Sequence, residues 1–236
     1  MTMDKEGMLQ ALFSSVGSDY GFGEVTAGFT PEKDMKIIWM RAFGWIDFWI
    51  SDYLEDAPAE VLESVADTIF ARISTQDSIA YSKPLVDYVT SDEFLTRNRP
   101  LYLSRVNGVS KGMEGRHVDL TDSYRRLVKK GLIEDDPSIV IRWAPMMEGS
   151  YAGHSSILMR TVCVSRRLDN VYVPDEVLDF ILFSQIAFVQ EDFNQDPSKN
   201  ILLAKETLKE YPEYDRLMKN VTGMGLRLWR EVSPAD

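Results

Sequence analysis

The chain has 236 residues, of which 44% are hydrophobic and 11% are aromatic, and it carries 26 Lys and Arg residues against 37 Asp and Glu residues. This composition is sufficient for a folded core and excludes a disordered chain as the first interpretation. The net charge of -11 makes nonspecific binding to nucleic acid or to an anionic membrane unfavourable, so neither partner is expected.

The single cysteine, Cys163, excludes an intramolecular disulfide and a cysteine-rich zinc module. It lies in the apolar run 161–164, where we expect a buried, unreactive thiol. The first residues lack the basic start and long apolar stretch of a secretory signal. The most apolar segment, residues 37–54, contains charged residues and is shorter than a bilayer span. A cytoplasmic protein is therefore expected.

The N-terminal half is predicted to be helical. Thr30-Pro31-Glu32 resembles a helix start, and a helix is predicted over residues 31–54. Its apolar residues recur at steps of three and four and would form one stripe: Trp39, Phe43, Ile46, Trp49, Ile50 and Tyr53. Core packing is the expected role of this stripe, and a partner-binding surface is the alternative.

Further helices are predicted over residues 58–73 and, in shorter pieces, 83–94, and a connector is predicted over 97–115. Residues 1–110 would thus form a helical region that packs on the rest of the chain, without an independent domain boundary. Glycines near the N-terminus lack the context of a phosphate-binding loop: Gly21, Gly23 and Gly28.

The C-terminal half mixes helices and strands. A helix is predicted over 119–132, and its basic face is expected to be solvated surface: Arg125, Arg126, Lys129 and Lys130. Two strands are predicted over 138–143 and 156–165, with Gly149 and Gly153 between them.

The next helix starts at the turn Val173-Pro174 and is apolar nearly all round over 177–189, which is typical of a helix in the middle of a domain. Helical segments over 200–210 and 213–231 complete the chain.

Three stretches together resemble the SprT-like zincin metallopeptidases: residues 117–120, residues 139–143 and, most specifically, residues 162–189. Residues 211–214 resemble a segment downstream, and helix 59–73 shows a weaker similarity. The resemblance covers about residues 115–214. It implies an α+β, zincin-like fold over residues 111–236, in which a small, mainly antiparallel sheet packs on a central helix, with an additional helical N-terminal region.

In that family the central helix carries His-Glu-x-x-His, because imidazoles four residues apart grip one zinc ion and the glutamate activates the bound water. The corresponding residues here are Ser184-Gln185-Ile186-Ala187-Phe188. A serine hydroxyl is a poor zinc ligand, phenylalanine is none, and glutamine cannot exchange a proton as a carboxylate does. The third ligand would fall near Lys199 or Asn200. We therefore expect no catalytic residue, no metal and no cofactor.

Other metal sites are hard to build from this sequence. The two histidines, His117 and His154, lie far apart in the predicted elements. Glu191, Asp192 and Asp196 could hold a hard cation such as calcium, but they lack the spacing of an EF-hand, so helix-end and loop charges are the expected interpretation.

The resemblance leads to a catalytically inactive, metallopeptidase-like protein that binds a protein or peptide, for example along a sheet edge. In it, Phe188 would fill the former metal position and Gln185 would bond to nearby backbone. One alternative is a hydrolase of altered chemistry that uses Glu191 and Asp192 with a metal other than zinc. The other is an interaction or dimerisation module that uses the aromatic helix 31–54. The sequence leaves the partner and the oligomeric state open.

Overall fold

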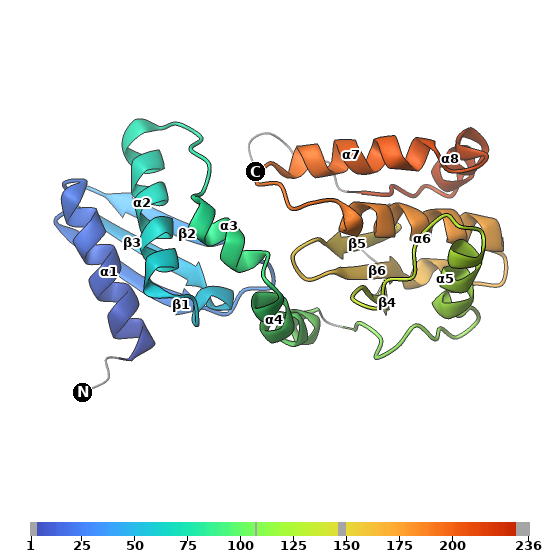
Figure 1. Ribbon diagram of the computed structural model, residues 1–236, viewed down its shortest axis with the longest axis horizontal. Coiled ribbons are helices and arrows are strands. Elements are labelled where there is room, and N and C mark those ends of the chain that lie inside the picture. Colours follow the sequence, from blue (N-terminus) through green and yellow to red (C-terminus); the bar gives the residue numbers. More distant parts are fainter. Residues whose placement is uncertain (1–3, 107, 146–149, 230–236) are drawn as a thin grey trace. The chain divides into compact units, whose positions relative to one another are not determined.

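The computed structural model describes residues 4–106, 108–145 and 150–229, and it is a mixed α+β structure. The chain divides into two compact units, Met1–Arg105 and Val106–Asp236, each with its own three-stranded sheet (Figure 1). In the part of the chain that is described, no helix combines the length and the apolar character needed to cross a membrane.

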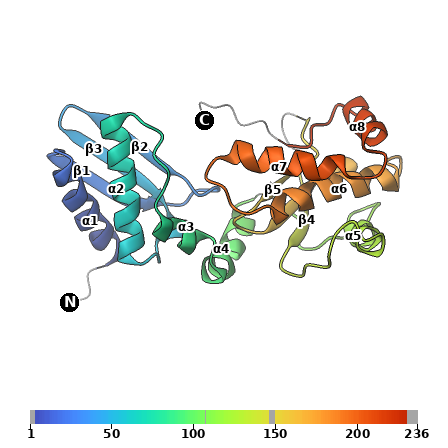
Figure 2. The ribbon, with the colours of Figure 1, turned by 45° about the horizontal axis from the view of Figure 1, so that its top comes forward.

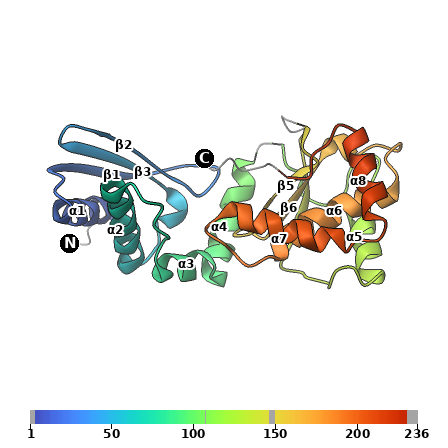
Figure 3. The same cartoon turned by 90° about the horizontal axis from the view of Figure 1, so that it is seen from above.

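The first unit packs two helices on one face of a sheet. Its elements in chain order are α1 (Lys5–Asp19), β1 (Glu24–Thr30), β2 (Ile37–Ala42), β3 (Trp45–Ser51), the 3-10 turn η1 (Asp52–Leu54), α2 (Ala59–Thr75), α3 (Lys83–Val89) and α4 (Asp92–Arg105). The strand order is β1-β3-β2, with β1 parallel and β2 antiparallel to β3. Seen from above, α1 and α2 lie side by side under this sheet (Figure 3).

The helix predicted over residues 31–54 is wrong, because this segment forms the hairpin of β2 and β3. Along β3, the side chains of Ile46, Phe48 and Ile50 are buried, whereas those between them are more exposed. This two-residue period is typical of a strand, and Gly44, at φ 82°, forms the turn before it. The aromatic residues fit both the helical spacing of three to four residues and the strand spacing of two, so the turn at Gly44 distinguishes the hairpin from a helix.

The first unit is therefore not an all-helical region. The helix predicted over 58–73 is confirmed as α2, whereas α1 was not predicted. The predicted connector 97–115 is wrong over its first part, because residues 97–105 continue α4, with Pro100 inside the helix. In the core, Phe13 of α1 contacts Phe48 of β3 and Phe70 of α2.

The second unit is built around the buried helix α6 (Asp175–Gln190). The other elements are α5 (Leu120–Lys129), β4 (Val140–Ala144), β5 (Gly153–Ser156), β6 (Thr161–Ser165), the 3-10 turn η3 (Arg166–Leu168), α7 (Pro197–Lys209) and α8 (Tyr214–Gly223). Figure 2 shows α7 running along α6, and the two helices are in contact. The helices expected over 119–132, 177–189 and 200–210 are confirmed.

Two sequence expectations for this sheet need correction. The strand expected over 156–165 is β6 only from residue 161 onward, because residues 157–160 form a turn, and β5 lies over Gly153–Ser156, mostly in the segment expected to be the turn. The sheet is mixed rather than mainly antiparallel, because β4 is parallel and β5 antiparallel to β6. Gly149 and the end of the helix expected to reach Glu231 lie outside the described residues; α8 ends at Gly223.

The two units share one topology. Each has a helix, three strands in the order first-third-second, a 3-10 turn and a second helix that follows a proline. The registers also agree, since Thr30 pairs with Ser51 and Ala144 pairs with Ser165. In both units this serine donates its backbone N–H to the carbonyl of the residue close before the second strand in the sequence. The acceptor is Lys36, before β2, at 3.0 Å in the first unit and Ala152, before β5, at 2.8 Å in the second.

The correspondence extends to the residues. Ser51, Leu54 and Pro58 of the first unit match Ser165, Leu168 and Pro174 of the second, and the Glu-Val-Leu triplet at 60–62 matches that at 176–178. Leu54 and Leu168 are both buried, at 1% and 0% exposure. The chain therefore contains two units that repeat one arrangement of a helix, three strands and a helix.

Candidate functional site

The positions that the resemblance aligns with a zinc motif, residues 184–188, lie in α6, whose side chains are buried almost throughout. Pro174 caps the helix start with extended backbone, and the acids Asp175 and Glu176 lie in the first turn, where the helix dipole favours negative charge. The sequence therefore specifies a helix that starts at a defined residue and passes through the core.

Ser184, Gln185 and Phe188 occupy three different surroundings. The Ser184 hydroxyl is fully buried and donates to the Ile181 carbonyl of its own helix at 2.7 Å. Phe188 is only partly buried and packs against the apolar core of the second unit. Gln185 is fully buried, yet its amide is satisfied on both sides. Of the three, only Gln185 reaches beyond its own helix to another polar group.

The Gln185 amide joins strand β5 to the C-terminal segment of the chain. Its Nε2 donates to the Leu228 carbonyl at 2.8 Å, as predicted for a bond to backbone, and its Oε1 accepts from the Ser155 hydroxyl at 2.9 Å. Gly153 makes this approach possible, because a Cβ there would lie 2.5 Å from the Cys163 carbonyl oxygen and 3.4 Å from the Gln185 amide.

The C-terminal segment, residues 226–229, contacts the backbone just before β5 through Arg227. Arg227 accepts a hydrogen bond from the Ala152 N–H at 2.8 Å and donates its own N–H to the Ser150 carbonyl at 2.9 Å. The flanking leucines, Leu226 and Leu228, are 4% and 5% exposed and belong to the core of the second unit. This C-terminal segment thus forms an isolated parallel bridge to Tyr151 and reaches Gln185 of α6 through the Leu228 carbonyl.

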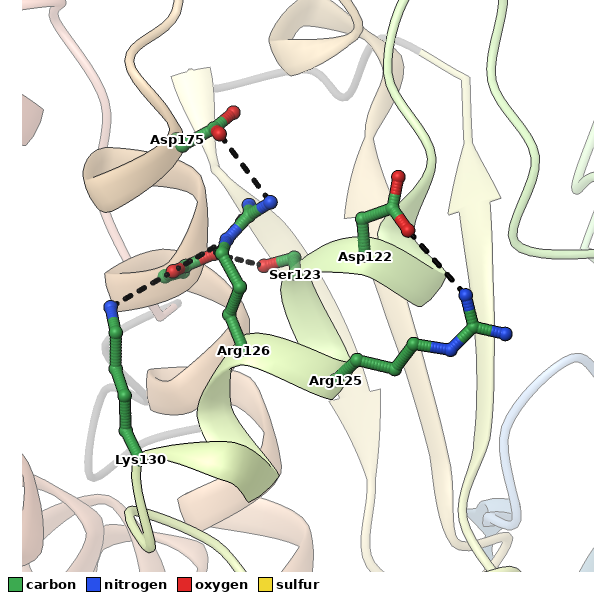
Figure 4. A network of polar contacts seen from close by, with 7 residues as sticks. Asp122, Ser123, Arg125, Arg126, Lys130 and Asp175 are labelled. Atoms are coloured by element: carbon green, nitrogen blue, oxygen red, sulfur yellow. Dashed lines mark hydrogen bonds and ion pairs between the residues drawn. The ribbon is translucent and has the colours of Figure 1, made fainter.

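A second polar network joins α5 to α6 around Asp179. The Asp179 side chain is 1% exposed, and its carboxylate accepts from the Ser123 hydroxyl at 2.7 Å and from Arg126 at 2.7 to 3.1 Å. The Lys130 ammonium lies 3.5 Å from the same carboxylate. Figure 4 shows Ser123, Arg126 and Lys130 pointing toward α6, while Asp175 meets the outer side of Arg126.

This network has a structural role, because it holds α5 against α6. Asp179 raises the pKa of Arg126 through their hydrogen bonds, which keeps the guanidinium charged. Hydrogen bonds between a carboxylate and charged donors are shorter and stronger than neutral ones, so these contacts tie α5 to α6. The basic face predicted for this helix is therefore only partly solvated surface, since Arg126 and Lys130 turn toward a buried acid.

Asp169 holds together two of the stretches that carry the family resemblance. Its carboxylate accepts three backbone N–H groups, from Arg116 at 2.6 Å, His117 at 2.8 Å and Val118 at 3.1 Å. Burial raises the pKa of this carboxyl, but the three N–H donors outweigh burial, so that the pKa lies below its ordinary value. Asp169 therefore fixes the loop before α5 onto the end of β6.

The residues considered as metal ligands have structural roles instead. Asp196 caps α7 by accepting from the Ser198 N–H, and Glu191 accepts from the Thr207 hydroxyl. Asn200 is buried and donates to the Asp192 carbonyl, whereas Lys199 is exposed. His117 lies in the loop that binds Asp169, His154 lies on β5 on the face opposite Ser155, and Cys163 is fully buried in β6.

The positions of the first unit that correspond to Ser184, Gln185 and Phe188 also lack typical metal ligands. By the correspondence of Pro58 with Pro174, Ser184 matches Thr68, Gln185 matches Ile69 and Phe188 matches Arg72. Within the described residues, no group of three or more His, Cys, Asp and Glu side chains is arranged to hold a metal ion.

Comparisons of the chain with protein-family models, with curated proteins and with solved structures gave no match. Function is therefore inferred from the chain's own residues. Sequence reasoning had found Gln185 but missed its partner Leu228, because nothing local to residues 226–229 indicates this contact.

Proposed function

We propose that the protein is a catalytically inactive, zincin-like protein, related to the SprT-like peptidases, that binds a peptide along the backbone just before β5. In this structure its own C-terminal segment takes the place of that peptide. The observation that carries the proposal is the hydrogen bond from Gln185 to the Leu228 carbonyl, because Gln185 stands where the resemblance puts the catalytic glutamate.

The chemistry of the motif supports the loss of activity. A hydroxyl, an amide and a benzyl group at Ser184, Gln185 and Phe188 supply neither zinc ligand nor general base. The amide gains what the carboxylate lacks, a donor that binds a peptide carbonyl. A site that once polarised a peptide group is thus suited to holding one.

The backbone geometry supports peptide binding. Strand addition supplies main-chain hydrogen bonds for affinity, while pockets for alternate side chains supply selectivity. The C-terminal segment uses both features, since Arg227 makes the backbone bonds and Leu226 and Leu228 fill the apolar core. The expected ligand is therefore an extended segment with aliphatic residues two positions apart.

The hydrolase alternative lacks comparable support. It requires Glu191 and Asp192 to act on a substrate, but Glu191 accepts from Thr207 and the Asp192 backbone accepts from Asn200. A casein hydrolysis assay with and without added zinc, calcium or manganese tests this alternative, and metal-dependent cleavage that is lost on replacing Glu191 would favour it over the inactive protein.

A matched pair of variants tests peptide binding. Arg227→Pro removes the N–H that bonds to Ser150 and so loosens the C-terminal segment. Arg227→Ala keeps this bond because alanine retains the backbone N–H, and it costs little packing because the Arg227 side chain is exposed. A tethered segment competes at an effective concentration in the millimolar range. A labelled peptide of residues 223–236 should therefore bind Arg227→Pro at least tenfold more tightly than Arg227→Ala or the unaltered chain, by fluorescence anisotropy.

A folded Arg227→Pro variant that does not prefer this peptide over a scrambled one would contradict the proposal. Amide exchange of the unaltered chain gives a second readout. The Arg227 amide should exchange faster than the amides of β6, because the segment must leave β5 without global unfolding. Equal protection of both would show that the segment is a permanent part of the fold.

A further inference from the structure

Strand β2 carries an exposed apolar surface at the edge of the first unit's sheet. Its side chains Ile38, Trp39 and Met40 are 41%, 43% and 52% exposed. Trp49 of β3, at 38%, pairs with Ile38 and shares its face of the sheet with Ile38 and Met40, whereas Trp39 pairs with the buried Phe48 and lies on the opposite face. Phe43 of the connecting turn is fully exposed. Single exposed apolar residues are ordinary, but a contiguous group of them indicates an interaction surface.

The backbone of β2 is also available along one side. Lys36 accepts the N–H of Ser51, so alternate residues of β2 direct their N–H and C=O groups toward β3. The groups of Ile37, Trp39 and Arg41 consequently point away from β3 to the open edge. Proteins commonly protect such edges with charges, proline or a bulge, and the strand Ile37–Ala42 contains one charge, Arg41.

The second unit provides an internal comparison. Its matching strand, β5, is short and consists of small and polar residues, Gly153-His154-Ser155-Ser156. Moreover, the backbone just before β5 is paired with Arg227 of the same chain. Within the described residues β2 forms ladder pairs with β3 alone. Within the part of the chain that is described, the apolar strand is thus the one that has no backbone pairing on its outer side.

We propose that β2 pairs with β2 of a second copy of this chain, antiparallel about Trp39, so that the two three-stranded sheets become one. In this register Ile37 of one copy faces Arg41 of the other, and both use the outward backbone groups. The exposed part of the five apolar side chains, summed over both faces of the sheet, is on the order of 500 Å² per copy, and strand pairing covers at most this apolar area. This area lies at the low end for specific interfaces, so a micromolar dimer is expected.

The net charge of the chain opposes dimer formation and makes the stability of the dimer depend on the salt concentration. Each chain carries a net charge of -11, so two copies repel one another at long range. Salt screens this repulsion and leaves apolar contact and backbone pairing intact. The dimer should therefore tighten as the salt concentration rises, unlike an association held by surface ion pairs.

The test is sedimentation velocity of the full chain over about 1 to 200 μM, with the pair Arg41→Pro and Arg41→Ala. Proline is tolerated where the N–H of an edge strand faces outward, and it removes that donor. Arg41→Ala removes the same side chain, including its bond to the Ile73 carbonyl, but keeps the N–H. The expected result is a dimer for the unaltered chain and for Arg41→Ala, and a dissociation constant at least tenfold weaker for Arg41→Pro.

Met40→Lys decides the matter if Arg41→Pro does not fold, because it keeps the backbone intact and adds a charge to the exposed surface. With unchanged circular dichroism, it should also weaken the dimer at least tenfold. An unaltered chain that stays monomeric up to 200 μM, or a dimer unaffected by Met40→Lys, would overturn the proposal. Arg227→Pro should leave the dimer unchanged, which separates this interface from the peptide site of the second unit.

Discussion

Replacing Gln185 by an acid tests the candidate site most directly. Gln185→Glu exchanges the amide donor for a carboxyl group at a position that is 0% exposed and lies 2.8 Å from the Leu228 carbonyl. An ionised carboxylate would there face a carbonyl oxygen without a donor between them. The ionised form is therefore strongly disfavoured in the folded state, while the unfolded chain pays no such cost.

The magnitude follows from burial. A fully buried carboxyl has a pKa raised by about 3 units, and each unit corresponds to about 1.4 kcal/mol. Between the ordinary and the raised pKa the folded protein binds more protons than the unfolded chain, so stability falls as the pH rises through this window. Gln185→Glu should lose about 1 kcal/mol at pH 5 and about 4 kcal/mol at pH 7.5, relative to the unaltered chain.

Urea unfolding at the two pH values measures this loss, and the exchange of β6 amides identifies the transition of the second unit. The matched control is Gln190→Glu, which makes the same chemical change at the exposed last residue of α6. It should stay within about 0.5 kcal/mol of the unaltered chain at both pH values. If the two variants behave alike, the Gln185 side chain is solvated and its bond to Leu228 is not part of the fold.

Two further predictions concern the buried acids of the second unit. Asp179→Asn should lower the free energy of unfolding by about 2 to 3 kcal/mol, because Arg126 loses its buried anion. The control is Asp175→Asn, since Asp175 lies near the same guanidinium but is 71% exposed. This change should alter the free energy of unfolding by less than about 0.5 kcal/mol in the same urea assay. Asp169→Asn should cost about 1 to 2 kcal/mol at neutral pH. Because the pKa of Asp169 is lowered, its contribution is present above the ordinary carboxyl pKa and disappears as the pH falls through the lowered value; the variant should therefore lose less stability than the unaltered chain on acidification, as measured by unfolding between pH 6 and 2.

Local patterns predicted the helices of the second unit well and the hairpin of the first unit wrongly. Helix α6 begins at a proline, carries acids in its first turn and is apolar on all sides, and these signals agree. Around Trp39 and Trp49 they conflict, because dense aromatic residues satisfy both helical and alternating spacing. Pairing with β3 decided in favour of strands, and that pairing depends on the neighbouring β1 and on the helices beneath.

The repeated arrangement illustrates the same limit. The Glu-Val-Leu triplets after Pro58 and Pro174 were visible in the sequence, but their meaning depended on the strands before them. Those strands differ in composition between the units, since β2 is aromatic and β5 is small and polar. Only the shared strand order and register show that the two segments occupy the same place in a repeated unit.

The sequence by itself determined that a buried helix runs through the second unit and that residues 184, 185 and 188 of this helix are a serine, a glutamine and a phenylalanine. These are properties of adjacent residues and their chemistry. Tertiary structure alone decided what Gln185 does, since its partner Leu228 is 43 residues away, and which acids are buried, since Asp179 depends on donors from α5. Contacts between distant segments form through packing and strand pairing, which no local pattern specifies.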